Sequence, residues 1–185
     1  LEREAWARTL WRFVFKGNLV LGMFNADPHP GNYIFHPNGA VTFLDYGCVQ
    51  SIPKERKAHA RAMHRAAIEG DSENFAVHLK QMIGAKPGPL ADMAVDYTKI
   101  CFAPLFEAPY RITRPYAANL VDGMKDMAKV AKDLPQEQFF TMPKEMLFMN
   151  RLQFGFYSVL ARLDVSVDYA QVEREILSEP DNPTA

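Results

Sequence analysis

Residues 24–47 read Phe-Asn-Ala-Asp-Pro-His-Pro-Gly-Asn-Tyr-Ile-Phe-His-Pro-Asn-Gly-Ala-Val-Thr-Phe-Leu-Asp-Tyr-Gly. The rest of the chain is organised around this stretch, which holds three polar side chains at a defined spacing. Asn32 follows Asp27 by five positions, and Asp45 follows Asn32 by thirteen. The two prolines after Asp27 fix their own φ angles and keep the residues before them out of helical conformation. We therefore expect a rigid loop that carries Asp27 and Asn32.

A β-hairpin is predicted directly after this loop. Residues 33–35 and 41–44 are rich in aromatic and β-branched side chains, and the Pro-Asn-Gly at 37–39 is a strong turn signal between them. A hairpin returns the chain to the point where it began, so this one brings Asp45 back beside Asn32. The rest of the chain reads as helices that support this unit.

An Asp, an Asn and a second Asp in this order are typical of phosphoryl-transfer sites. Such sites need metal ions that bridge the phosphates and a carboxylate near the attacking group. In protein kinases a catalytic-loop Asp lies five positions before a metal-binding Asn, and the Asp of an Asp-Phe-Gly segment completes the metal site. Asp27, Asn32 and Asp45 fit that order. Their oxygen atoms suit Mg²⁺ or Mn²⁺, which take further ligands from phosphates such as those of ATP.

The same residues resemble a known family. The Ala-Asp-Pro-His-Pro-Gly-Asn at 26–32, followed by Leu-Asp-Tyr-Gly at 44–47, closely resembles the ABC1/UbiB/ADCK family of atypical kinase-like proteins. Residues 143–151 are similar to the family's late helix. The resemblance implies a kinase-like fold, ATP binding and ATPase-type activity. It also implies a role linked to isoprenoid lipids such as ubiquinone precursors, often at membranes.

The resemblance also implies a role for each polar residue. Asp27 would be the catalytic-loop aspartate, Asn32 a metal ligand and Asp45 the main metal ligand, so that the last two hold the metal-bound nucleotide. This chain departs from the family pattern at two positions. Asn25 stands where the family usually has a His that supports the catalytic loop, and Tyr46 replaces a Phe. The first departure bears on the rigidity of the loop rather than on its chemistry.

We expect a single domain over residues 1–185, mainly α (α+β), with the fold of the C-terminal lobe of a protein kinase. It comprises a catalytic loop at 24–32, a metal-binding hairpin at 33–47 and a helical remainder at 53–177. The late helix is apolar on more than one face, which is typical of the central helix of a lobe. The pattern predicts helices at 2–16 with a stop at Gly17-Asn18, a buried extended run at 19–24, and helices at 53–69, 71–83, 90–103, 115–133 and from Pro143 onward.

A kinase-like site also needs a phosphate-binding loop and a strand-borne Lys. Neither precedes residue 27. We therefore expect the N-terminal lobe to lie outside this chain, which by itself should bind ATP or ADP poorly and turn over little. The link from Gly47 to Pro53 is too short for the long activation segment of protein kinases. ATP hydrolysis or small-molecule phosphorylation is therefore favoured over phosphorylation of proteins.

Composition and charge narrow the classes of function. The chain is 48% hydrophobic and 12% aromatic, which excludes a disordered chain, and its net charge of −1 offers no basic field for nucleic acid. Lys57, Arg61 and Arg65 recur at helical spacing, and we expect them to form a solvated basic face. Cys48 and Cys101 make neither a CxxC pair nor a disulfide framework, which suits a reducing compartment such as the cytoplasm or the mitochondrial matrix. No apolar run of about 18 residues predicts a transmembrane span, so we expect any membrane association to be peripheral.

Two other interpretations stay open. In the first, a metal-dependent phosphohydrolase holds a transition metal, which imidazole and carboxylate together suit, between Asp27, His29, His36 and Asp45. Against it, we expect His29 to structure the loop and His36 to lie on an exposed turn. In the second, the lobe is non-catalytic and binds a lipid or a partner through the Met- and aromatic-rich segment 139–163.

Overall fold

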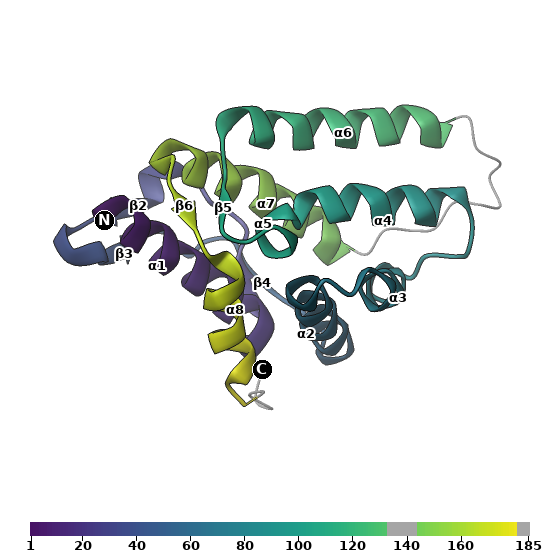
Figure 1. Cartoon of the computed structure of the whole chain (residues 1–185), viewed down its shortest axis with the longest axis horizontal. Helices are drawn as coiled ribbons and strands as arrows, with labels where there is room; N and C mark the ends of the chain where they lie inside the picture. The colour runs from purple at the N-terminus through teal and green to yellow at the C-terminus, as the bar shows by residue number, and fades with distance from the viewer. Residues whose placement is uncertain (133–143, 181–185) are drawn as a thin grey trace.

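The computed structural model describes residues 1–132 and 144–180. Helices dominate this part of the chain (Figure 1). They are α1 (Glu2–Lys16), α2 (Lys54–Glu69), α3 (Ser72–Ile83), α4 (Pro89–Cys101), α5 (Ala103–Phe106), α6 (Arg114–Lys132), α7 (Lys144–Leu163) and α8 (Tyr169–Ser178). The mainly α fold class predicted from the sequence is confirmed.

Short strands pair antiparallel in two-stranded sheets. The pairs are β1 (Met23–Asn25) with β4 (Val49–Ser51), β2 (Tyr33–Phe35) with β3 (Val41–Phe43), and β5 (Tyr110–Arg111) with β6 (Ser166–Val167). The β2–β3 pair is the predicted hairpin, and its register places Tyr33 opposite Phe43. Its turn is a 3₁₀ segment, Pro37–Gly39, in which Asn38 takes a left-handed φ of 64°.

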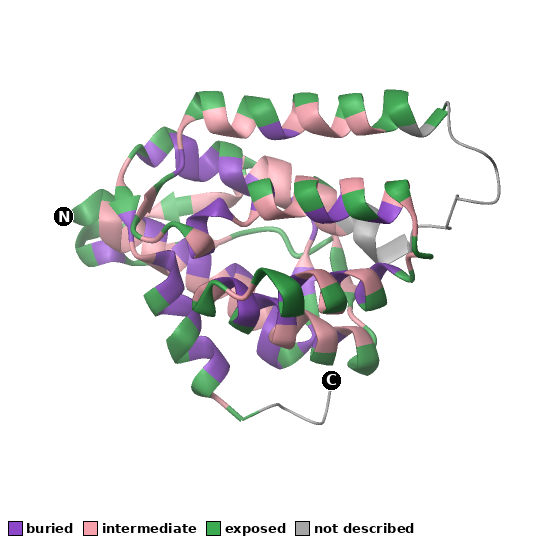
Figure 2. Ribbon diagram, turned by 45° about the vertical axis from the view of Figure 1, so that its right-hand side comes forward, coloured by how far each residue is buried: buried purple, intermediate pink, exposed green. Residues whose placement is uncertain are grey.

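Helix α1 packs against α7 and α8, and α7 packs against α6. In Figure 1, α4 and α6 run side by side, α2 and α3 form a neighbouring pair, and α8 lies beside the N-terminal part of the fold. Buried residues concentrate toward the middle of the molecule, whereas the outer edge of α6 is exposed (Figure 2). Over the described residues, no helix combines the length and apolarity needed to cross a membrane.

The centre of the core is Trp11 of α1, which is 1% exposed. Its ring centroid lies 5.9 Å from that of Phe156 in α7 and 4.1 Å from that of Tyr169 in α8. Its indole Nε1 donates a 2.9 Å hydrogen bond to the buried carboxylate of Glu173. The other oxygen of Glu173 lies 2.6 Å from Nδ1 of the buried His64 of α2. One aromatic and polar cluster therefore joins four elements, and α7 is as central as its sequence predicts.

The predicted helix stop at Gly17-Asn18 is wrong. The chain continues from α1 into a π-helical turn, Gly17–Leu21, and ends at Gly22, which has a left-handed φ of 70°. Gly17 itself is right-handed. It is required for another reason, since a Cβ there would lie 2.8 Å from the backbone oxygen of Met23. The extended run expected over residues 19–24 is consequently limited to β1 and its approach.

The predicted solvated basic face is also wrong for two of its three members. Lys57 is 2% exposed, and its Nζ donates to the backbone oxygen of Val20 at 3.2 Å. Arg61 donates to the backbone oxygen of Leu19 at 2.8 Å. Both side chains satisfy carbonyl groups of the π-helical turn, which explains why they point inward. Only Arg65 is exposed as expected.

The remaining helix predictions are close to the structure. Gly70 ends α2 with a left-handed φ of 72°, and Asp71 caps α3 by accepting a 3.0 Å hydrogen bond from the Asn74 backbone N–H. Helices α4 and α6 each begin one residue before the predicted range and end within it, whereas the single turn of α5 is not predicted. The predicted start of the last helix at Pro143 lies outside the described residues.

Candidate functional site

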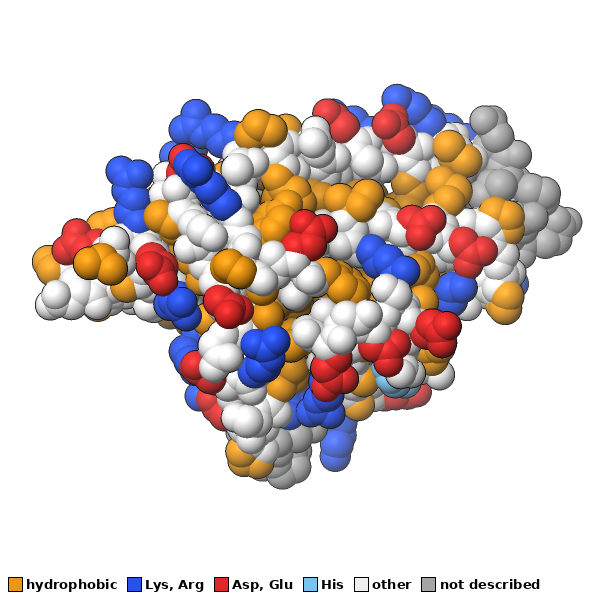
Figure 3. Space-filling model, in the orientation of Figure 1, with side chains coloured by type: hydrophobic (Ala, Val, Ile, Leu, Met, Phe, Trp, Pro, Cys, Tyr) orange, Lys and Arg blue, Asp and Glu red, His pale blue; other side chains and the backbone are white. Residues whose placement is uncertain are grey.

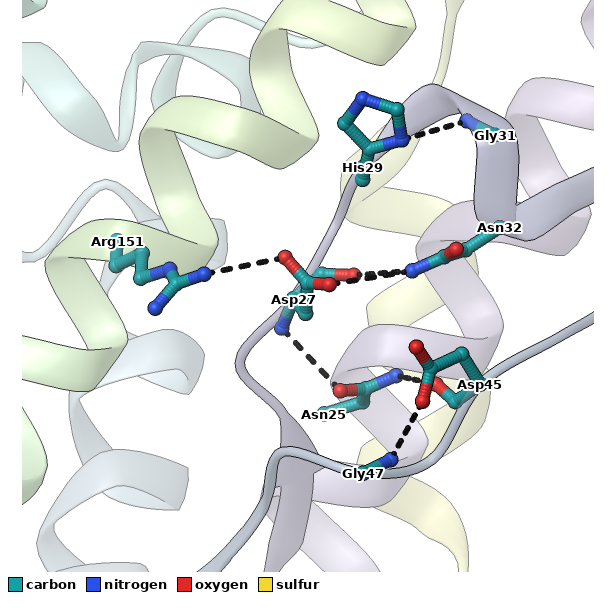
Figure 4. A network of polar contacts seen from close by, with 8 residues as sticks. All are labelled: Asn25, Asp27, His29, Gly31, Asn32, Asp45, Gly47 and Arg151. Carbon is teal, nitrogen blue, oxygen red and sulfur yellow. Dashed lines mark hydrogen bonds and ion pairs between the residues drawn. The ribbon is translucent and has the colours of Figure 1, made fainter.

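The first part of the site is the loop after β1, which carries Asp27 and Asn32 (Figure 4). The 3₁₀ turn Pro30–Asn32 brings Asn32 back toward Asp27. The Asn32 Nδ2 donates to the Asp27 backbone oxygen at 3.2 Å and to its Oδ2 at 3.4 Å. His29 holds the turn, because its Nδ1 accepts from the Gly31 N–H at 3.1 Å and its backbone oxygen accepts from the Asn32 N–H at 2.9 Å. His29 therefore does what the sequence indicates, and structures the loop.

Asp45 is the second part of the site. The hairpin ends where it began, because the Leu44 N–H donates a 2.8 Å hydrogen bond to the backbone oxygen of Asn32. Asp45 follows with a left-handed φ of 56°, a conformation that Asp adopts more readily than most residues and that often marks functional sites. Its Oδ1 accepts from the Gly47 N–H at 2.9 Å, and the residue is exposed. The hairpin thus brings Asp45 beside the loop, as the spacing predicts.

Asn25 links the two parts. Its Oδ1 accepts a 3.2 Å hydrogen bond from the Asp27 N–H, and its Nδ2 donates at 2.8 Å to the backbone oxygen of Asp45. Figure 4 shows this side chain between the loop and the hairpin end. Asn25, which stands where the family usually has a His, therefore bridges the loop and the end of the hairpin.

Arg151 is a site residue whose role the sequence does not predict. It extends from α7, and its Nη2 lies 3.2 Å from Asp27 Oδ1 (Figure 4). With Asn32 on the other oxygen, the carboxylate of Asp27 is held from both sides. The only sequence signal was the similarity of residues 143–151 to the family's late helix, which ends at this position. Helix α7 also packs on the loop itself, because a Cβ at Gly155 would lie 2.4 Å from Pro28 Cγ.

Tyr33, which follows Asn32, is the titratable neighbour of the loop whose pKa is shifted. Burial and, to a smaller extent, the negative charge of Asp27 together raise the pKa of the neighbouring Tyr33 to about 12. Tyr33 is therefore a neutral phenol at neutral pH. The side chain of Asp27 itself is 35% exposed and open to a ligand.

The donor set fits a hard divalent cation. It consists of the carboxylate of Asp45 and the amide oxygen of Asn32, with Asp27 nearby, and Mg²⁺ or Mn²⁺ bound by so few side chains takes phosphate oxygens and waters as its remaining ligands. Among the described residues, no group of three or more His, Cys, Asp or Glu side chains is arranged to hold a metal ion. The alternative with Asp27, His29, His36 and Asp45 is therefore not formed. His36 instead contacts Thr42 Oγ1 at 2.9 Å on the exposed end of the hairpin.

Comparison with known proteins agrees with this geometry. Residues 1–79 match the model of the ABC1 atypical kinase-like domain. The chain is 46% identical over 39 residues to the Arabidopsis thaliana chloroplastic protein named "activity of bc1 complex kinase 3", a match that covers 21% of this chain and 6% of that protein. It is 31% identical over 78 residues to an uncharacterized Synechocystis protein, covering 40% of this chain and 19% of the relative.

A solved structure matches nearly the whole chain. The Rv3197–erythromycin complex from Mycobacterium tuberculosis superposes with a TM-score of 0.65 at 18% identity, covering 96% of this chain and 45% of that one. At this identity the match concerns the fold alone. The chain thus spans less than half of the solved relative and a smaller part of the curated ones.

The chain has a mainly α fold, which it shares with the solved mycobacterial structure. Residues 1–79, which contain the loop and the hairpin, match the ABC1 atypical kinase-like domain. The family resemblance read from residues 26–32 and 44–47 is confirmed.

Proposed function

We propose that this chain supplies the metal-binding half of an ATP-dependent phosphoryl-transfer site, which is completed by an N-terminal lobe. One observation carries the proposal. Asp27, Asn32 and Asp45 lie on two neighbouring segments that are tied by hydrogen bonds, directly and through Asn25. This is the order and grouping of acidic and amide groups that kinase-like sites use.

Each residue then has a chemical role. Asn32 and Asp45 would hold Mg²⁺ or Mn²⁺, which when bound neutralises charge on the ATP phosphates. Asp27 would orient the attacking hydroxyl or water and accept its proton. Arg151 and Asn32 fix the two oxygens of that carboxylate, so Asp27 meets its substrate in one orientation. Such preorganisation is what an electrostatic site contributes to catalysis.

The segment after Asp45 favours a small substrate. Directly after Gly47 the chain enters β4, which pairs with β1, and the Ala26 N–H donates at 2.9 Å to the backbone oxygen of Cys48. This stretch is therefore committed to the sheet and offers no platform for a peptide. We propose ATP hydrolysis or phosphorylation of a small molecule, linked to isoprenoid-quinone or related lipid metabolism. The lipid link rests on the family resemblance.

The test uses this chain together with the proposed N-terminal lobe. Metal-dependent ATP hydrolysis is measured for the wild type and for Asp45→Asn, with Asp96→Asn as a matched control on the exposed face of α4. We expect Asp45→Asn to lower turnover by about 100-fold or more, since removing one group that stabilises developing charge has effects of that size. Asp96→Asn should leave turnover unchanged.

A second readout separates catalysis from binding. Nucleotide with Mn²⁺ should raise the melting temperature of the wild type, because a ligand that binds only the folded state stabilises it, and Asp45→Asn should remove that shift. Unchanged hydrolysis in Asp45→Asn would refute the assignment. Stabilisation by a lipid without nucleotide, equal in both proteins, would favour the non-catalytic interpretation.

A further inference from the structure

A partly open cavity between the helices is lined by none of Asp27, Asn32 and Asp45. It has a volume of about 130 Å³ and is lined by side chains of α1, α2, α3, α4, α6 and α7, among others. Its walls are mainly apolar and rich in methionine and aromatic rings, including Trp11, Met63, Met82, Phe102, Met149 and Phe156. On the face shown in Figure 3, hydrophobic side chains gather along the seam between α4 and α6. An apolar cavity of about this size stays dry and can bind a molecule such as benzene.

One polar atom in the wall is unsatisfied. Asn18, on the π-helical turn, lines the cavity and is 4% exposed, and within the described residues its Oδ1 has no hydrogen-bond partner. A buried acceptor without a donor is costly, so each such group calls for an explanation. The neighbouring carbonyl groups of Leu19 and Val20 are bonded by Arg61 and Lys57. The turn is therefore firmly held, and π-helical turns of this kind often occur at functional sites.

Two hydroxyl groups in the wall are already hydrogen-bonded to backbone oxygens. Tyr97 donates its hydroxyl to the Leu120 backbone oxygen at 2.9 Å, and Tyr157 donates to the Cys101 backbone oxygen at 2.9 Å. Burial raises the pKa of the Cys101 thiol to about 11, so this wall carries no thiolate at neutral pH. Among the described residues, Asn18 Oδ1 is the one fully buried side-chain oxygen or nitrogen without a hydrogen-bond partner, whereas a buried water needs two to four polar partners. The cavity thus suits a neutral guest with one donor.

We propose that this cavity binds a small, mainly apolar molecule whose single hydrogen-bond donor is accepted by Asn18 Oδ1. The site does not rest on the proposed phosphoryl-transfer function, since Asp27, Asn32 and Asp45 do not line it. Apolar surface supplies the affinity of such a guest, and the one polar contact supplies its selectivity.

A matched pair of probes tests the proposal. Indole and benzothiophene share two fused rings, but benzothiophene has a sulfur atom where indole has its N–H. Binding to the protein is followed by NMR of isotope-labelled methionine methyl groups, because Met63, Met82, Met124, Met127 and Met149 line the cavity. We expect both probes to shift these methyl signals and indole to bind about tenfold more tightly, the effect of one good hydrogen bond.

Two variants locate the contact. Asn18→Leu keeps the size of the side chain and removes the acceptor, so indole and benzothiophene should bind it with equal affinity. Asn119→Leu makes the same change on the exposed side of α6 and should keep the tenfold preference. The proposal is overturned if neither probe shifts the methionine signals, if the wild type binds both equally, or if Asn18→Leu keeps the preference. Should Asn18→Leu fail to fold, the comparison of the two probes on the wild type decides.

Discussion

Replacing Gly155 with Ala tests whether α7 positions the loop of the candidate site. Gly155 faces Pro28, and an added Cβ would lie 2.4 Å from Pro28 Cγ and 3.4 Å from its Cδ. The proline ring cannot rotate out of the way, because it is part of the backbone. Either α7 or the loop must therefore move. Because Asp27 precedes Pro28 and contacts Arg151 of α7, either movement disturbs the site.

The size of the effect follows from two opposing terms. Within a helix, Gly to Ala is favourable by about 0.5–1 kcal/mol, because Ala loses less backbone entropy. Forcing an extra methyl group into a packed contact costs about 1–3 kcal/mol. The steric term is the larger, so we expect Gly155→Ala to lower the free energy of unfolding by about 1–2 kcal/mol. Metal-dependent nucleotide binding by this chain together with the proposed N-terminal lobe should weaken as well.

Urea unfolding measures the first effect, and Gly123→Ala in α6 provides the control. There the added Cβ would lie 3.2 Å from Cε2 of Tyr97, a side chain that can shift. The gain in helix propensity and the cost of the mild crowding nearly cancel, so the free energy of unfolding should change by no more than about 0.5 kcal/mol. If Gly155→Ala stabilises the protein and leaves nucleotide binding intact, α7 does not position the loop as described.

Three further predictions concern the interior and one helix end. Glu173→Leu leaves the buried Trp11 N–H without its acceptor and should lower the free energy of unfolding in urea by about 2–4 kcal/mol. Glu173→Gln keeps a carbonyl oxygen and should lower it by less. Equal losses in the two variants would contradict the role of this hydrogen bond. Hydrogen bonds from the backbone and side chain of Asn74 hold the pKa of Asp71 below its usual value. The stabilisation by Asp71 is therefore present above the pKa of the unfolded state and is lost as the pH falls through the lower folded-state pKa. The difference in unfolding free energy between wild type and Asp71→Ala should then shrink below about pH 4. A difference that stays constant with pH would exclude the charge of Asp71 as its source. Because burial raises the pKa of Cys101 to about 11, iodoacetamide should label it far more slowly in the folded protein than in urea at about pH 8; similar rates by mass spectrometry would show that the thiol is accessible.

The loop and the hairpin could be predicted from sequence because their contacts are local. Asn25, Asp27, Asn32 and Asp45 all fall within residues 24–47, and proline, glycine and a hairpin turn restrict the backbone between them. The hydrogen bonds that join them span at most 20 positions. Local stereochemistry therefore suffices to bring the three polar residues together.

Gly17 shows where local reasoning fails. A glycine after a helical pattern usually allows a left-handed cap, and the sequence predicts a stop there. Glycine also allows a close approach of backbone, and in this protein that second property applies, because Met23 O occupies the space of a Cβ. The sequence does not distinguish the two uses. The two uses are distinguished only by the tertiary structure, in which the chain returns through β1 and places Met23 O beside Gly17.

The family resemblance, the mainly α class and the grouping of Asp27, Asn32 and Asp45 could all be predicted from the sequence, because each depends on residue types at short spacing. The tertiary structure alone decided that Arg151, 124 positions away, holds Asp27, and that Lys57 is buried on a carbonyl group 37 positions away. It also decided that Asn18 lines a cavity. Periodicity predicts that a helix has a buried face, but only long-range packing determines which polar groups that face meets.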